Sequence, residues 1–124
     1  IVDSLYKIKP PFNVNKIAQV SAIESLKDKK FVTKSIKHNL YWSKKLKAFF
    51  ESKNLKTNLC TANFFMIDFD NCKFSSSYVL KKLEKNGIIL RSLENYHMKN
   101  KLRVTIGSTK ENQKLIKNLN IIIK

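Results

Sequence analysis

"GIILRSLENYHMKNKLRVTIGS", residues 87–108, contains both arginines of this chain, Arg91 and Arg103. Every other basic residue apart from the histidines is a lysine, so the change of side chain within this stretch needs a physical reason. Lysine is a flexible, hydrated point charge, whereas the planar fork of arginine can bind a carboxylate or phosphate through two hydrogen bonds. The stretch also contains two short strand-like runs. We expect residues 88–91 and 102–106 to pair as neighbouring antiparallel strands, which brings both arginines to one end of a sheet.

Two interpretations of this arginine pair follow from its chemistry. Two guanidinium groups held close together repel each other unless an anion lies between them, so the hairpin predicts an anion-binding site. Alternatively, each arginine forms a separate surface ion pair with Glu94, Glu111 or an aspartate. An exposed pair of this kind contributes under ~1 kcal/mol. The sequence leaves both interpretations open.

The segments that flank the hairpin predict a further strand and two helices. Residues 63–68 in "TANFFMIDFD" alternate and are rich in aromatic and branched side chains, which favours a strand. Ser75 or Ser76 can begin a helix that Gly87 ends in a left-handed conformation. Beyond the hairpin, the S-x-x-E sequence of residues 108–111 predicts a capping box that opens a last helix.

The N-terminal part predicts an extended segment followed by two helices. The proline pair in residues 1–13 favours extended backbone, and Asn13 can cap a helix over residues 14–26. Asp28 is a second candidate cap, and apolar residues after it keep the helical period to about Ser52. Such a long helix in a small domain often bridges two bodies, although packing along a sheet is the more ordinary explanation.

These elements predict an α/β fold of the α+β type. We expect a two-layer sandwich in which a small, mostly antiparallel sheet carries helices on one face, preceded by the long interdomain-type helix. A chain of 124 residues with 43% hydrophobic content can form a single domain over residues 1–124. We interpret residues 1–13 as an extended linker from an absent domain, because the chain begins Ile-Val-Asp without a methionine.

The formal net charge of +16 raises nucleic acid or an anionic membrane as partners. The lysines are spread through nearly every segment, however, which is typical of solvated faces in a lysine-rich sequence. A small basic RNA-binding domain is the rival function, but the strands lack an evident aromatic pair with intervening basic residues. No apolar run approaches the ~18 residues of a membrane span. We therefore expect neither a membrane nor a nucleic-acid partner.

The other reactive side chains do not form a recognisable catalytic or metal site. Cys60 and Cys72 do not combine with the histidines at zinc-site spacing or form a disulfide framework, so we expect reduced cysteines, no metal and a cytoplasmic location. Asn63 either caps a turn or contacts a ligand, and Tyr96 and His97 are expected in a solvated loop. The chain thus offers a place to hold an anion and no group to transform it.

Four stretches of the chain resemble a known family. "KIKPPFNVN…AQVSAIESLKD", "TANFFMIDF", "GIILRSL" and "KLRVTIGSTKEN" are similar, in this order and at similar separations, to the C-terminal part of histidinol-phosphate aminotransferases. These are fold-type-I pyridoxal-phosphate enzymes, and the resemblance covers essentially the whole chain. "GIILR" followed by "LRVTIG" is the most specific part of it.

The resemblance implies a role for individual residues. Arg103 corresponds to the arginine that binds the α-carboxylate of the substrate, and Arg91 to a second arginine that helps to bind its anionic group. Asn63 and Asn13 match family positions near the site. The loop differs from the family at His97, where a small residue usually follows the tyrosine.

The resemblance also implies what lies outside this chain. No segment matches the Schiff-base lysine or the residues that anchor the cofactor, so the chain alone should hold no catalytic residue and should not bind pyridoxal 5'-phosphate. The implied partners are an N-terminal large domain, a second subunit of a homodimer, and the substrates histidinol phosphate and glutamate or 2-oxoglutarate. A phospho-amino-acid decarboxylase of the same fold is the alternative inside the family.

Overall fold

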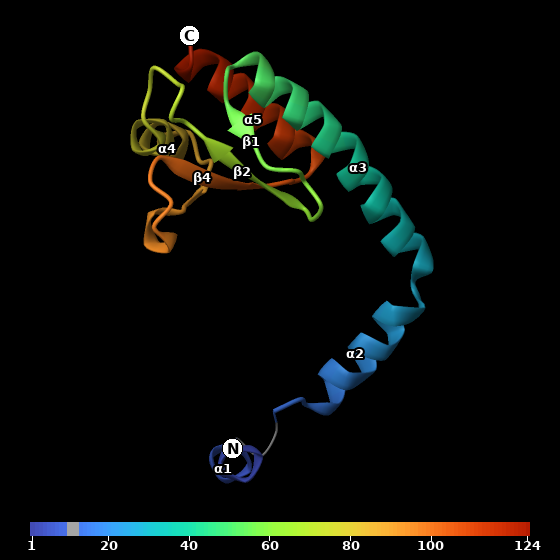
Figure 1. Cartoon of the computed structure of the whole chain (residues 1–124). Coiled ribbons are helices and arrows are strands. Elements are labelled where there is room, and N and C mark those ends of the chain that lie inside the picture. The colour runs from blue at the N-terminus through green and yellow to red at the C-terminus, as the bar shows by residue number, and fades with distance from the viewer. Residues whose placement is uncertain (10–12) are drawn as a thin grey trace. The chain divides into compact units, whose positions relative to one another are not determined.

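The computed structural model describes residues 1–9 and 13–124 (Figure 1). Contacts between residues divide the chain into two compact units, Ile1–Ile36 and Lys37–Lys124. The first unit contains α1 (Val2–Ile8), α2 (Lys16–Lys27) and the start of α3 (Lys29–Ser52). None of its described residues is buried. All of the hydrophobic core therefore belongs to the second unit.

The extended conformation predicted for residues 1–13 is wrong for Val2–Ile8, which form α1. Asp3 in the first turn of this helix and Lys7 in the last turn both complement the helix dipole. The proline pair on which the prediction depended lies outside the described residues. The role of residues 1–13 as a linker from a further domain stays a prediction.

The caps of the next two helices follow the sequence closely. The cap of α2 is Asn15 rather than Asn13, because the helix begins at Lys16, and the Asn15 side chain accepts from the N–H of Ala18 at 2.8 Å. Asp28 caps α3 as predicted, accepting from the N–H of Phe31 at 2.9 Å. In both helices the side-chain oxygen of the cap residue accepts from the backbone N–H three residues later, which is the usual N-cap contact of asparagine and aspartate.

The second unit contains a sheet of four strands in the order β1-β2-β4-β3. They are β1 (Lys56–Thr57), β2 (Phe64–Asp68), β3 (Arg91–Ser92) and β4 (Lys101–Thr105), and every neighbouring pair is antiparallel. The central position of β4 confirms the predicted pairing of the hairpin. The sequence pattern did not predict β1, which follows the C-terminus of α3.

The bounds predicted for the first strand of the hairpin are wrong, because residues 88–90 do not pair with β4 and β3 begins at Arg91, where the predicted strand ended. Arg103 accordingly lies in the middle of β4 and not at its start. Residues 88–90 leave α4 (Ser76–Lys85) through Gly87, whose φ is +66°, and the N–H of Ile88 still bonds to the carbonyl of Leu83 at 3.0 Å. Because Ile88 is still hydrogen-bonded to the end of α4, the chain first pairs with β4 at Arg91.

Two serine caps fix the helices of the second unit. Ser75 accepts from the N–H of Tyr78 and begins α4. Ser108 and Glu111 form the predicted capping box, which begins α5 (Thr109–Ile122). Between β3 and β4 the chain makes one short 3-10 turn, η1 (Glu94–Tyr96).

The core lies between one face of the sheet and the helices (Figure 1). Alternate residues of β2 and β4 point inward, and the helices contribute the other side of the core. The main inward residues are Phe65, Ile67, Leu102 and Val104 from the strands, with Phe50, Leu83 and Leu119 from α3, α4 and α5. This is the α+β sandwich that the sequence predicts, and the opposite face of the sheet carries the residues that alternate with the core.

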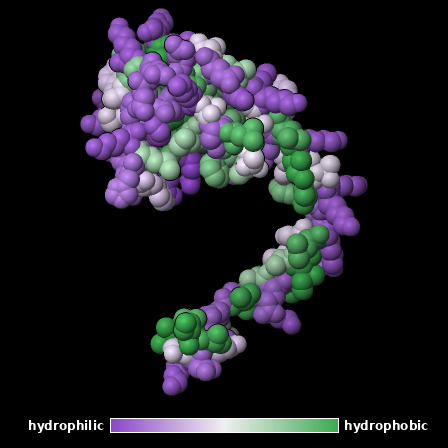
Figure 2. Space-filling model, in the orientation of Figure 1, coloured by the Kyte–Doolittle hydropathy of each residue, from purple (hydrophilic) through white to green (hydrophobic). Residues whose placement is uncertain are grey.

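Large apolar side chains are exposed in the first unit, where Figure 2 shows hydrophobic surface along α2. Ile17, Val20 and Ile23 of α2 are each half or more exposed, as are Phe31 and Val32 of α3. No helix among the described residues combines the length and the hydropathy needed to cross a bilayer.

Candidate functional site

The arginines Arg91 and Arg103 face each other directly across β3 and β4. Side chains of directly opposed residues lie on the same face of an antiparallel pair with their Cβ atoms roughly 5 Å apart. That face is the one turned away from the core, because the neighbours of Arg103 in β4, Leu102 and Val104, are buried. The predicted convergence of the two arginines therefore exists in the backbone register.

Each guanidinium group lies against an aromatic ring. The Arg91 Cζ atom lies 5.3 Å from the centroid of the Tyr96 ring, and Arg91 Nη2 donates to the Tyr96 hydroxyl at 2.5 Å. The Arg103 Cζ atom lies 5.4 Å from the centroid of the Phe64 ring. Stacking on an aromatic face is a contact that arginine makes well and that leaves its outward N–H groups available.

Neither arginine forms an ion pair with any residue that the structure describes. The Nε of Arg103 is buried and has no hydrogen-bond partner among those residues. Glu111, one of the carboxylates considered as a partner, instead accepts from the N–H of Ser108 at 2.7 Å, and this bond lowers the pKa of Glu111. The interpretation as ordinary surface ion pairs is thus not supported, and two positive charges remain without a compensating carboxylate.

Both arginines line one cavity of about 610 Å³. It lies where residues 88–90 separate from β4, and the start of α5 forms its far wall. Its lining comprises Gly87, Ile88, Ile89, Leu90, Arg91, Arg103, Val104, Thr105, Gly107, Glu111, Asn112, Lys114 and Leu115. Three of these residues are cationic and one is anionic, so the cavity favours an anion.

The turn between β4 and α5 is held by a buried amide. Asn112 accepts from the N–H of Gly107 at 3.0 Å and donates to the carbonyl of the same residue at 2.9 Å. His38 Nε2 donates to that carbonyl at 2.9 Å, and Trp42 Nε1 donates to Thr109 Oγ1 at 3.3 Å. These bonds tie α3 to the turn that follows the strand of Arg103.

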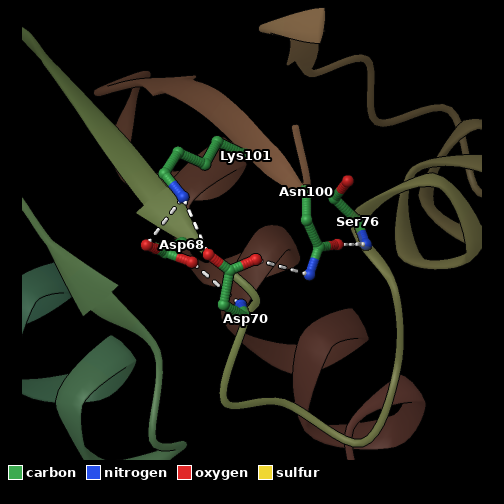
Figure 3. Close-up of polar contacts among 5 residues, drawn as sticks. All are labelled: Asp68, Asp70, Ser76, Asn100 and Lys101. Carbon is green, nitrogen blue, oxygen red and sulfur yellow. Dashed lines mark hydrogen bonds and ion pairs between the residues drawn. The ribbon is translucent and has the colours of Figure 1, made fainter. Parts of the chain in front are cut away.

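A second polar cluster lies on the same face of the sheet (Figure 3). Lys101 Nζ contacts Asp68 at 2.9 Å and Asp70 at 3.0 Å. The hydrogen bond to Asp68, followed by that to Asp70, raises the pKa of Lys101, and the bond from Lys101 lowers the pKa of Asp70. Lys101 and Arg103 are two residues apart on one strand, but only the charge of Lys101 is neutralised.

Asn100 connects this cluster to α4. Its side chain donates to Asp70 at 3.1 Å and accepts from the N–H of Ser76 at 2.7 Å (Figure 3). Its backbone has a φ of 56°, a left-handed conformation that asparagine tolerates better than most residues. The turn that precedes β4 is therefore fixed to the start of α4.

The two asparagines considered as site residues have different surroundings. The Asn63 carbonyl accepts from the N–H of Ile106 at 2.8 Å, so its backbone extends the pairing of β2 with β4, while its side chain is exposed. Asn13 is exposed and belongs to the first unit. Their contact with a ligand stays a prediction. The sequence analysis placed Tyr96 in a solvated loop and gave it no role, and it did not consider Asn112 or His38 as site residues. Only the fold brings these three side chains to Arg91 or to the turn after β4.

Comparison with known proteins relates this arrangement to one family. Residues 1–119 match the family model of class I and II aminotransferases. The chain is 49% identical over 123 residues to a histidinol-phosphate aminotransferase of Pelagibacter ubique (strain HTCC1062), covering 98% of this chain and 34% of that protein. It thus spans about a third of the length of the curated relatives that it matches.

Solved structures share the fold. The histidinol-phosphate aminotransferase of Clostridium acetobutylicum is similar with a TM-score of 0.74 and 26% identity, over 92% of this chain and 35% of that one. A decarboxylase of Sulfurospirillum multivorans is similar with a TM-score of 0.69 and 20% identity, over 99% of this chain and 36% of that one. The second likeness shows a common fold alone.

Proposed function

From the premise that the chain belongs to the class I and II aminotransferase family, we propose that it is the C-terminal, substrate-binding part of a histidinol-phosphate aminotransferase. The family depends on pyridoxal phosphate. The full-length enzyme is a cytoplasmic homodimer in this proposal, and its large domain precedes the present chain. The named relatives at up to 49% identity support this choice of substrate.

The observation that carries the proposal is the pair of uncompensated arginines. They lie directly opposite each other, line one cavity, and have no carboxylate partner among the described residues. Holding two such charges together is unfavourable unless an anion is bound, so the arrangement is useful to the protein only with a ligand. A planar fork binds a carboxylate or a phosphate through two bonds, and both groups occur in the substrates of this reaction.

In the proposed enzyme Arg103 binds the α-carboxylate of glutamate and Arg91 assists with the bulkier phosphate group. Histidinol phosphate carries a phosphate ester arm where glutamate carries that carboxylate. One pair of arginines can therefore serve both half-reactions. The Phe64 and Tyr96 rings support the two forks without neutralising them.

The cavity suits the anionic group of a substrate better than the cofactor. Its only lysine, Lys114, has its Nζ atom 3.5 Å from the carbonyl of Gly87, at the end of the cavity formed by the exit from α4. When bound by the large domain, pyridoxal phosphate supplies the electron sink of the reaction. The contribution of this chain is to fix the substrate by its anion, because the orientation of the reacting bonds decides which one breaks.

The test is steady-state kinetics of the full-length enzyme with Arg103→Lys and Arg91→Lys. Lysine keeps the charge but loses the second parallel bond. Loss of one charge-assisted hydrogen bond costs about 1.5–3 kcal/mol, or roughly tenfold to a hundredfold in kcat/KM. We expect Arg103→Lys to impair both half-reactions, and Arg91→Lys to impair the phosphate-bearing substrate more than glutamate.

Lys99→Gln is the matched control, because it removes an exposed charge from the same loop without touching the cavity. It should leave kcat/KM within about twofold, which is under ~0.5 kcal/mol. An Arg103→Lys enzyme that also stays within twofold for both substrates would show that the arginines are ordinary surface charges.

A further inference from the structure

Tyr96 contacts Arg91 in two ways at once. Its ring lies under the guanidinium carbon at 5.3 Å, and its hydroxyl oxygen accepts a hydrogen bond from Arg91 Nη2. Arginine has donors only, so the direction of this bond is fixed. The ring contact and the hydrogen bond together restrict the long Arg91 side chain, which would otherwise sample many rotamers in solvent.

The partner that holds Arg91 is neutral, and this distinguishes it from the neighbouring cation on the sheet. Lys101 is held by two aspartates and has its charge compensated. Arg91 is held by a phenol and keeps its whole charge for a ligand. A carboxylate at position 96 would also fix the side chain but would compete with any incoming anion.

Tyr96 acts on the cavity only through Arg91. Arg91 lines the cavity, whereas Tyr96 does not. The phenol contacts one Nη atom of the guanidinium group, and the other N–H groups of Arg91 have no hydrogen-bond partner among the described residues. A ligand therefore meets the guanidinium and not the ring.

The turn that carries Tyr96 is itself anchored at both ends. At its start Leu93 is buried, and its carbonyl accepts from the N–H of Tyr96 at 2.9 Å. At its end Asn100 is fixed to Asp70 and to the first residue of α4, Ser76 (Figure 3). The position of the phenol is consequently set by the fold rather than by a freely moving loop.

From these contacts we propose that Tyr96 is a positioning residue that orients Arg91 toward the anion in the cavity, and that it thereby favours the phosphate-bearing substrate. This inference rests on the proposed function. The phosphate group is larger than a carboxylate and has more oxygens to satisfy, so it depends more on the orientation of the second fork.

The experiment uses the full-length enzyme with Tyr96→Phe and Tyr96→Leu. Phenylalanine keeps the ring but loses the hydroxyl, and leucine loses both contacts. We expect Tyr96→Phe to raise KM for histidinol phosphate about three- to tenfold, which is less than the effect of Arg91→Lys, because the lost hydrogen bond holds Arg91 and not the ligand itself. The kcat and the KM for glutamate should stay within about twofold, and Tyr96→Leu should raise KM for histidinol phosphate further.

Tyr78→Phe is the matched control. Tyr78 is a partly exposed tyrosine of α4 that stacks on Phe74, and its hydroxyl has no hydrogen-bond partner among the described residues. Its loss should change no kinetic constant. All variants should unfold at the wild-type temperature, since a general structural defect would lower that temperature and would not separate the two substrates.

The outcomes separate this inference from the function on which it rests. If Arg91→Lys raises KM for histidinol phosphate and Tyr96→Phe does not, the positioning role is refuted and the anion site remains. If the enzyme does not transaminate, the proposed function fails, and calorimetric titration with inorganic phosphate still decides the role of Tyr96. Weaker phosphate binding by Tyr96→Phe than by Tyr78→Phe supports it, and equal binding overturns it.

Discussion

Replacement of Asn112 by alanine tests how the turn after β4 is held. Asn112 is almost fully buried, with 2% of its surface exposed, and its amide makes two hydrogen bonds with Gly107. The Gly107 carbonyl would keep its bond from His38, but the Gly107 N–H would lose the Asn112 oxygen, its acceptor among the described residues. An unsatisfied, partly buried donor costs about 1–3 kcal/mol, and the second lost bond adds about 1 kcal/mol. Asn112→Ala should therefore lower the free energy of unfolding by about 2–4 kcal/mol.

Equilibrium unfolding in urea measures this change, and Asn118→Ala is the control. Asn118 lies on the same helix and also makes two side-chain hydrogen bonds, one to Asn86 and one to the Lys114 carbonyl, but it is partly exposed. Water can replace both bonds, so the control should cost under ~1 kcal/mol. If the two variants lose the same stability within ~0.5 kcal/mol, the burial argument for Asn112 is wrong. Asn112→Asp should be more damaging at neutral pH, because a carboxylate oxygen would then face the Gly107 carbonyl.

Three further results are expected. Gly87→Ala should destabilise the chain by about 1–2 kcal/mol in urea unfolding, because alanine is strained at a φ of +66°; an unchanged midpoint would contradict the role of this glycine. The pKa values of Asp70 and Glu111 are lowered in the folded chain, so their stabilisation is present above the ordinary values of 3.8 and 4.5. It should be lost as the pH falls through the lower folded values, and Asp70→Asn should flatten this acid dependence. The exposed apolar side chains of residues 14–36 should cause concentration-dependent association in sedimentation, unless a preceding domain covers them.

The local signals in the sequence were sufficient for most of the second unit. Ser75 and the Ser108–Glu111 capping box begin their helices because these side chains bond to backbone only three residues away. The antiparallel placement of β4 followed from the alternation of its residues and the shortness of the connecting turn. These contacts join residues that are close together in the sequence, so the sequence pattern alone was enough to predict them.

The features that the sequence did not predict depend on contacts between residues that are far apart in the chain. β1 is only Lys56–Thr57, and it exists because these residues pair with the far end of β2. Residues 88–90 have the composition of a strand, but the end of α4 keeps them away from β4. Among the candidate site residues, the convergence of Arg91 and Arg103 was predicted. The contact of Tyr96 with Arg91 was not, because it depends on the 3-10 turn Glu94–Tyr96, which the sequence pattern did not reveal.

The two ion pairs of Lys101 also determine how this amine behaves toward reagents. Acylating compounds attack the neutral amine, and Lys101 is held in its protonated form between Asp68 and Asp70, with 21% of its side chain exposed. Lysines that extend into solvent, such as Lys99, carry no comparable protection. A covalent labelling experiment on the folded chain would therefore modify Lys99 early and Lys101 late. The rate at which Lys101 gains mass would then report how often its ion pairs with Asp68 and Asp70 open.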